Sequence, residues 1–253
     1  MVLSRLFLAL GGLALAAGAA IPSFNTSDVT GTNWLLNGNV LLWGHDGRTQ
    51  AITHAEWEEL KTNLTVGPPP PPPNWNVTRP ARNDTHGLQA RGACEGIAEL
   101  QILETQTFVN WDVQVSPVVG NQYDQAYVSM AEGYSISNAI AISIQAWYGP
   151  LSKVLTLVLG VTYTRTWTTS TTETIADYVP AGLSGLIVSN PVTVRRYGNY
   201  IEGCYDDPTY NWYSADEQIP HTYQSVDWVQ GAFRLCASKD YPVPFCEGNG
   251  FHY

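Results

Sequence analysis

Basic residues are scarce in this chain. Of its 253 residues, 12 are Lys or Arg and 22 are Asp or Glu, so the formal net charge at pH 7 is −10. An acidic chain repels phosphate backbones and anionic headgroups, which argues against a nucleic-acid-binding protein. The same acidity keeps secreted proteins soluble, so by itself it indicates no particular partner.

The common motifs of metal sites and catalytic centres are also missing. There is no CxxC pair and no His at ligand spacing, so we expect no metal. Ser184 lies in GLSG, which lacks the G-x-S-x-G spacing of a nucleophile elbow. The acidic pairs Asp206-Asp207 and Asp216-Glu217 leave a secreted glycoside hydrolase as the weakest alternative, because adjacent carboxylates point in different directions. We predict a non-enzymatic protein with no cofactor and no catalytic residue.

Long apolar runs are limited to the start of the chain. Arg5 precedes LFLALGGLALAAGAA, a short apolar stretch that ends in small residues near Ala20. The stretch is shorter than the ~20 residues of a membrane-spanning helix. We interpret residues 1–20 as a signal peptide and predict a secreted, extracellular protein.

Cysteine is infrequent, and the four cysteines are even in number. In a chain that enters an oxidising compartment they predict disulfides, with three possible pairings. We favour Cys236 with Cys246, because the intervening segment contains two prolines and can form a short closed loop. This pairing leaves Cys94 to bond with Cys204.

Four N-glycosylation sequons lie ahead of the first cysteine. Their asymmetry predicts a glycosylated, solvent-facing leader before a compact body. The sequons begin at Asn25, Asn63, Asn76 and Asn83.

The leader, residues 21–66, contains a small predicted structural unit. NVLLWGHDGRTQAI is typical of a strand, a turn and a second strand, and Thr53 with Glu56 forms the capping box of a short helix. A hairpin and one helix bury too little apolar surface to be stable alone. The leader therefore docks on the body, is a propeptide, or remains loosely ordered.

Residues 67–93 form a proline-rich linker. Six consecutive prolines favour polyproline II, and the rest is polar without periodicity. Arg82 and Arg91, with Arg79, are candidate sites for a processing protease, and a plain spacer is the alternative. The dibasic pair Arg195-Arg196 lies within a strand pattern instead, so we do not expect cleavage there.

The body, residues 94–253, alternates like β-strands almost throughout. It predicts an all-β domain, either a sandwich or an elongated antiparallel sheet. Its most distinctive passage is a long Ser/Thr-rich hairpin that begins at Tyr134. One strand has apolar residues from Ile136 to Ala146, and the other from Leu155 to Tyr163.

Several segments resemble a known group of proteins. QTFVNWDVQVSPVV, WTTSTTETI with VPAGLSGLIVSNPVTVRRYGNYIEGC, WVQGAFRLCASKDYPVPFCEGNGFH and the leader element VLLWGHDGRTQAITHAEWEEL resemble the effector-like small secreted proteins of filamentous fungi. The resemblance implies secretion and a role in virulence against a host or a competitor. It transfers no catalytic residue. Tyr134 to Gly185 also has a more distant likeness to aerolysin-type β-pore-forming proteins, in which Ser/Thr-rich strands flank an insertion hairpin.

Two hypotheses of function follow. The first, which the sequence favours, is an extracellular effector that binds a host or competitor protein or glycan through exposed aromatic residues. The second is a protein whose hairpin inserts into membranes, since each apolar face has about the length of a membrane strand, ~9–11 residues. A membrane partner is expected only under the second. The candidate binding aromatics are Trp212, Tyr213, Tyr223 and Trp228.

Overall fold

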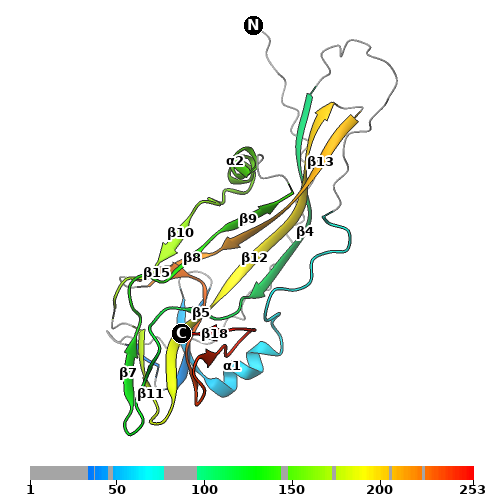
Figure 1. The fold of residues 1–253 in the computed structure, drawn as a ribbon. Helices are drawn as coiled ribbons and strands as arrows, with labels where there is room; N and C mark the ends of the chain where they lie inside the picture. Colours follow the sequence, from blue (N-terminus) through cyan, green and yellow to red (C-terminus); the bar gives the residue numbers. More distant parts are fainter. Residues whose placement is uncertain are drawn as a thin grey trace.

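The computed structural model of the chain describes residues 34–36, 38–44, 48–76, 96–143, 148–172, 175–204, 207–223 and 226–253. Strands dominate these residues, and two helices accompany them (Figure 1). The predicted all-β fold class is therefore confirmed. Most strand pairs are antiparallel.

One long strand, β12 (Ser184–Cys204), runs through the whole molecule. Its 21 residues span about 70 Å at roughly 3.3 Å per residue. Its first half pairs with β16 (Gly231–Ser238) and, on the other side, with β5 (Val113–Gln114) and β6 (Val119–Gly120). Its second half pairs with β13 (Asp207–Gln218) and β4 (Gly96–Val109).

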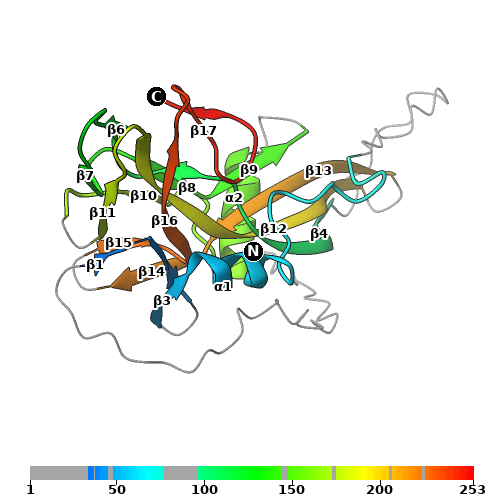
Figure 2. The same cartoon turned by 90° about the horizontal axis from the view of Figure 1, so that it is seen from below.

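The second half of β12 lies in a four-stranded sheet that projects away from the rest of the molecule (Figure 1). We call it the extended sheet; its strand order is β4, β12, β13 and β9 (Ala139–Ile142). The remainder, which we call the base, holds most of the core. Figure 2 shows the small strands of the base gathered on the side away from β13 and β4.

The base contains several short strands around a core rich in large side chains. Trp43, Trp228 and Phe233 are fully buried there. Its other strands are β1 (Trp34–Leu35), β2 (Asn39–Trp43), β3 (Thr49–Thr53), β7 (Ala126–Ser129), β8 (Ser135–Ser137), β10 (Thr166–Thr168), β11 (Ile175–Val179), β14 (Pro220–Tyr223), β15 (Val226–Val229), β17 (Val243–Pro244) and β18 (Phe251–His252).

The leader is docked on the base. As predicted, it forms a hairpin, β2 and β3, followed by helix α1 (His54–Lys61) with a Thr53/Glu56 capping box. β2 pairs with β16, and its Leu41 and Trp43 are fully buried in the core. Of the three possibilities for the leader, docking is the one that the described residues display.

The predicted long hairpin is only partly present. β8 and β10 pair at its base, but the second strand expected from Leu155 is instead part of helix α2 (Tyr148–Leu159). The prediction was wrong here because Leu151 and Leu155, one helical turn apart, bury together against the extended sheet. Leu151 and Leu155 are four residues apart, a spacing that fits one face of a strand as well as one face of a helix.

The structure shows the predicted disulfide between Cys236 and Cys246. Cys94 and the side chain of Cys204 lie outside the described residues. Asn63 and Asn76 are exposed, as a glycosylation site requires. Asn25, Asn83 and the candidate processing residues Arg79, Arg82 and Arg91 also lie outside the described residues.

Candidate functional site

The most unusual local structure lies between β8 and β10. The chain leaves β8, forms β9 at the edge of the extended sheet, continues as α2 and returns to β10 (Figure 1). We call residues 139–143 and 148–165 the insert. Its two ends are neighbours, because β8 and β10 are antiparallel partners.

The ends of the insert are anchored in the base. Trp167 of β10 is buried in the main core, and Ile136 of β8 packs against the same cluster. Just beyond the pair, the Asn138 amide nitrogen donates to the Thr162 carbonyl oxygen at 2.9 Å. The Asn138 amide oxygen accepts from the Gln218 backbone N–H at 2.7 Å. We call the β8–β10 pair together with Asn138 the neck of the insert. The bond from Gln218 holds the neck against β13.

The register of the neck fits the sequence of the insert. Ile136 lies opposite Trp167 and Ser137 opposite Thr166. Because antiparallel partners share a face, continuing this register would place Ile140 opposite Tyr163 and Ile142 opposite Val161. The alternate face would carry Ala139 with Thr164 and Ala141 with Thr162. An offset of one residue would instead mix the apolar and polar faces.

In the structure the insert does not follow this register. α2 has neither an acidic first turn nor a basic last turn, and it ends at Gly160, whose φ of +69° suits glycine. Leu151 and Leu155 are fully buried, whereas Leu157 is 86% exposed and Val158 59% exposed. Beside the polar residues Ser152, Lys153 and Thr156, α2 therefore also exposes two large apolar side chains to water, which is unfavourable.

Helix α2 of the insert covers one face of the extended sheet. Leu151 and Leu155 pack in a cluster with Tyr200 of β12 and with Tyr213 and Ala215 of β13. Burial raises the pKa of Tyr213 above its ordinary value, so its hydroxyl stays protonated. This cluster stays out of water only while α2 lies on the sheet.

The first part of the proline-rich linker covers the opposite face. Residues 66–76, which we call the strap, follow α1 and pass along β4, where Val66 bridges Val109. The Trp75 ring packs edge-on against Tyr197 and Trp212, with centroids 4.8 Å apart in both cases. The Gln106 side-chain amide also donates to the Pro70 carbonyl oxygen at 3.2 Å. The extended sheet is thus covered on both faces.

The four predicted binding aromatics do not form a surface patch. Tyr213 and Trp228 are fully buried, and the Trp228 indole N–H donates to Ser189 Oγ at 3.1 Å. Tyr223 packs against the core cluster of the base, and Trp212 lies beneath Trp75. Aromatic content alone could not separate core from surface, because burial depends on strand register.

The adjacent charged pairs are used structurally. Arg195 forms two hydrogen bonds with Asp216, at 2.6 and 2.7 Å, on the strap side of the sheet. Arg196 bonds Glu217 at 2.6 Å on the insert side. Both arginines are therefore held in the sheet, as the strand pattern predicts, and the two carboxylates do not face one another. Asp206 and the Asp207 side chain lie outside the described residues.

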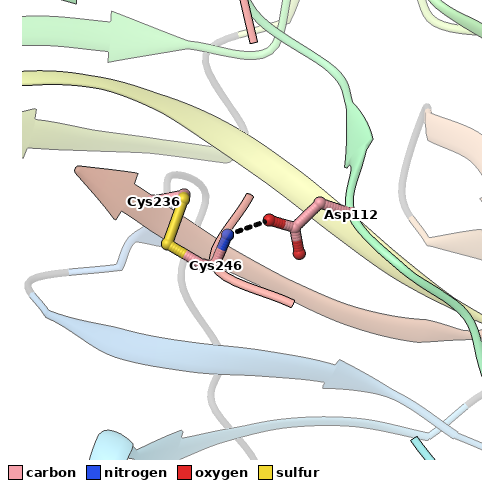
Figure 3. Close-up of side chains that lie close together, drawn as sticks. All are labelled: Asp112, Cys236 and Cys246. Carbon is pink, nitrogen blue, oxygen red and sulfur yellow. Dashed lines mark hydrogen bonds between the residues drawn. A yellow bond between two sulfur atoms is a disulfide. The ribbon is translucent and has the colours of Figure 1, made fainter. Parts of the chain in front are cut away.

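One group of potential metal ligands occurs among the described residues: Asp112 with Cys236 and Cys246 (Figure 3). The two sulfurs are bonded to each other and cannot act as thiolates. Asp112 instead accepts the Cys246 backbone N–H at 2.6 Å. The group is a structural contact, and no sequence motif marked Asp112 as part of it.

The described part of the chain contains no helix that is both long and apolar enough to cross a membrane. Comparisons with protein-family models, curated proteins and solved structures yield no match.

Proposed function

We propose that the protein acts on membranes outside the cell, and that the insert refolds into a membrane-spanning β-hairpin within an oligomeric pore. The single observation that carries this proposal is the neck register. Extending the β8–β10 pairing brings the large apolar side chains Ile140, Ile142, Leu157, Val161 and Tyr163 to one face. The other face has Ser143, Thr162 and Thr164 together with the smaller apolar residues Ala139, Ala141 and Val158.

The length of the refolded arms supports the same proposal. Residues 138–147 would pair with 156–165, which makes ten residues per arm, against the ~9–11 that a membrane strand requires. The apolar face would contact lipid, and the face with Ser143, Thr162 and Thr164 would line a water-filled lumen. Exposure of Leu157 and Val158 in the soluble form favours release of α2, because the helix leaves apolar area in water.

The predicted signal peptide and the resemblance to fungal secreted effectors would place the target membrane on a host or a competitor. Under this proposal the effector acts by permeabilisation, without catalysis. A binding effector that relies on Trp212, Tyr213, Tyr223 and Trp228 has less support, because two of the four are buried.

Two adjacent exposed residues provide a sharp test. Leu157 and Val158 both face water in the soluble form, so a lysine at either position should leave the fold intact. In the hairpin they face opposite sides. Leu157→Lys places a charge toward lipid, which costs between ~1 and ~4 kcal/mol per subunit depending on depth. Val158→Lys places it in the lumen.

The measurement is dye release from phosphatidylcholine vesicles, with and without sterol, before and after proteolytic nicking. Wild type and Val158→Lys should release dye at similar rates, and Leu157→Lys should release it at least tenfold more slowly. Ile142→Lys, nearer the middle of the arm, should lose more, with thermal melting as its fold control. Equal rates for Leu157→Lys and Val158→Lys, or no release by wild type under any of these conditions, would contradict the proposal.

A further inference from the structure

Exposed tyrosines gather at the end of the base opposite the extended sheet. Tyr127 on β7 and Tyr178 on β11 are cross-strand partners, with exposures of 46% and 44% and ring centroids 5.5 Å apart. Tyr123, in the loop before β7, is 87% exposed. We call these three residues the tyrosine tip; β7 and β11 lie far from β13 in Figure 1.

The tyrosine tip is held in place by its own backbone contacts. Asn121 Oδ1 accepts the Tyr123 backbone N–H at 3.0 Å and the Asp124 N–H at 3.4 Å, which shapes the loop. The Gly182 N–H donates to the Asn121 carbonyl oxygen at 2.8 Å and ties this loop to the turn after β11. Val128 and Val179, on the other face of the strand pair, are buried in the core. The rings therefore sit on a rigid support, which lowers the entropic cost of binding.

The charges around the tip exclude one class of ligand. The described segments that build it, residues 119–133 and 175–184, contain no Lys or Arg. Asp124 is exposed there, beside the amides Gln122 and Gln125. Phosphate, sulfate and anionic sugars bind best where the potential is positive, so exposed Asp124 and the absence of Lys and Arg in these segments disfavour them.

We infer that the tyrosine tip binds an uncharged saccharide on the target surface. A pyranose ring has an apolar C–H face that stacks on a tyrosine ring, and its hydroxyls pair with amides and a carboxylate. Tyr127 and Tyr178 supply the stacking surface, and Gln122, Asp124 and Gln125 supply hydrogen-bonding groups within the same loop. The surface goes beyond membrane insertion and does not depend on it, because no residue of the insert takes part.

The test is retention on insoluble neutral polysaccharides: chitin, β-1,3-glucan and mannan. Sulfated dextran serves as the anionic comparison, and phosphatidylcholine vesicles as a lipid comparison. The variant is Tyr127→Ala with Tyr178→Ala, and the matched control is Tyr241→Ala, an exposed tyrosine outside the tip. Because each of these tyrosines is a little under half exposed, the double variant should lower the melting temperature only modestly, and this measurement verifies the fold.

Wild type and Tyr241→Ala should bind at least one neutral polysaccharide, and the double variant should bind at least tenfold more weakly. Tyr127→Phe with Tyr178→Phe should retain most of the binding if stacking dominates. The inference would be overturned by any of four results. Wild type binds no neutral polysaccharide, prefers sulfated dextran, or binds lipid alone, or the alanine variant binds as well as wild type.

These experiments distinguish a failure of the membrane-insertion proposal from a failure of the saccharide-binding proposal. Leu157→Lys should keep polysaccharide binding and lose dye release. The alanine variant of the tip should keep dye release from vesicles that contain no saccharide.

Discussion

At the scale of single residues, the most demanding group is the buried carboxylate of Asp112. It accepts hydrogen bonds from Asn190 at 2.7 Å and from Arg234 at 3.2 Å, in addition to the Cys246 backbone N–H. Burial alone would raise its pKa, but the nearby His252 imidazole and the Arg234 guanidinium outweigh this and lower the pKa below its ordinary 3.8. Asp112 is therefore ionised, and both of its carboxylate oxygens accept hydrogen bonds inside the protein.

Asp112→Asn should destabilise the protein strongly. The substitution removes the acidic partner 3.2 Å from buried Arg234 and leaves Glu247, 3.6 Å away, to face it. Removing one partner of a buried pair costs up to ~3–5 kcal/mol. Asp216→Asn is the matched control, because the Arg195–Asp216 pair is partly exposed; it should cost ~1 kcal/mol or less. Urea unfolding at pH 7 measures both free energies. Equal losses of unfolding free energy in the two variants would show that burial does not determine how much an ion pair contributes to stability.

Residue roles were predictable only where strand geometry decides them. Alternation along β12 separates Arg195 from Arg196, and alternation along β13 separates Asp216 from Glu217, as expected. Their pairing required the β12–β13 register, in which Arg195 lies opposite Asp216. Asp112 carried no signal, because a single acid between strands resembles any loop residue.

At the scale of elements, the leader contributes structure that the body lacks. Val40, Leu41, Leu42 and Trp43 of β2 are buried, and α1 adds Trp57. Lys61 at the end of α1 pairs with Glu247 near the carboxyl end of the chain. Local sequence signals predicted the hairpin and the capping box correctly, since both depend on neighbouring residues. They could not predict α2, whose leucines fit either a strand or a helix until the extended sheet buries two of them.

The leader should stay with the body after the linker is cut. Five buried apolar side chains, at ~1.5–3 kcal/mol each, contribute about 7.5–15 kcal/mol. Association costs ~4 kcal/mol or more, so the upper part of this range leaves the ~8 kcal/mol of a micromolar complex. Trypsin acting at the candidate linker arginines Arg79, Arg82 and Arg91 should give two fragments that co-elute on gel filtration and separate in denaturant. A freely dissociating leader would instead support a simple propeptide.

The strap should be held more weakly than the leader. It contacts the extended sheet chiefly through the Trp75 ring, whereas β2 is part of the core. Trp75→Ala should therefore speed hydrogen exchange at the Gly67 backbone N–H, which donates to the Val109 carbonyl oxygen at 2.8 Å, and leave the melting temperature of the base almost unchanged. A large loss of global stability would mean that the strap is an integral part of the fold. Hydrogen exchange with mass spectrometry, together with thermal melting, distinguishes the two results.

At the scale of the whole molecule, β12 links the base to the extended sheet, whose two faces are covered by α2 and by the strap. One buried histidine lies where the leader meets this base. His221 of β14 is 4% exposed, stacks on Trp43 of the leader at 4.8 Å and lies opposite Trp228 of β15. Burial lowers the pKa of His221 below 6.5, and a hydrogen bond with the Gly44 backbone only partly opposes this.

Acid should therefore loosen the base through His221. A histidine whose folded pKa is lowered binds its proton more readily when unfolded, so stability is complete above pH ~6.5 and falls as pH decreases toward the folded pKa. The slope for one proton is at most about 1.4 kcal/mol per pH unit. The Asp112 contribution to stability is lost at lower pH, below that carboxyl's ordinary pKa of 3.8.

Urea unfolding between pH 7.5 and 4.5 measures the free energy of unfolding at each pH. It should fall with this slope in wild type and in the control His54→Gln, and less steeply in His221→Gln. Identical slopes in all three proteins would show that another group senses acid. With the predicted slope present, Trp43 would come to lie beside a charged imidazole, and the contact between the leader and the base would be the first to weaken.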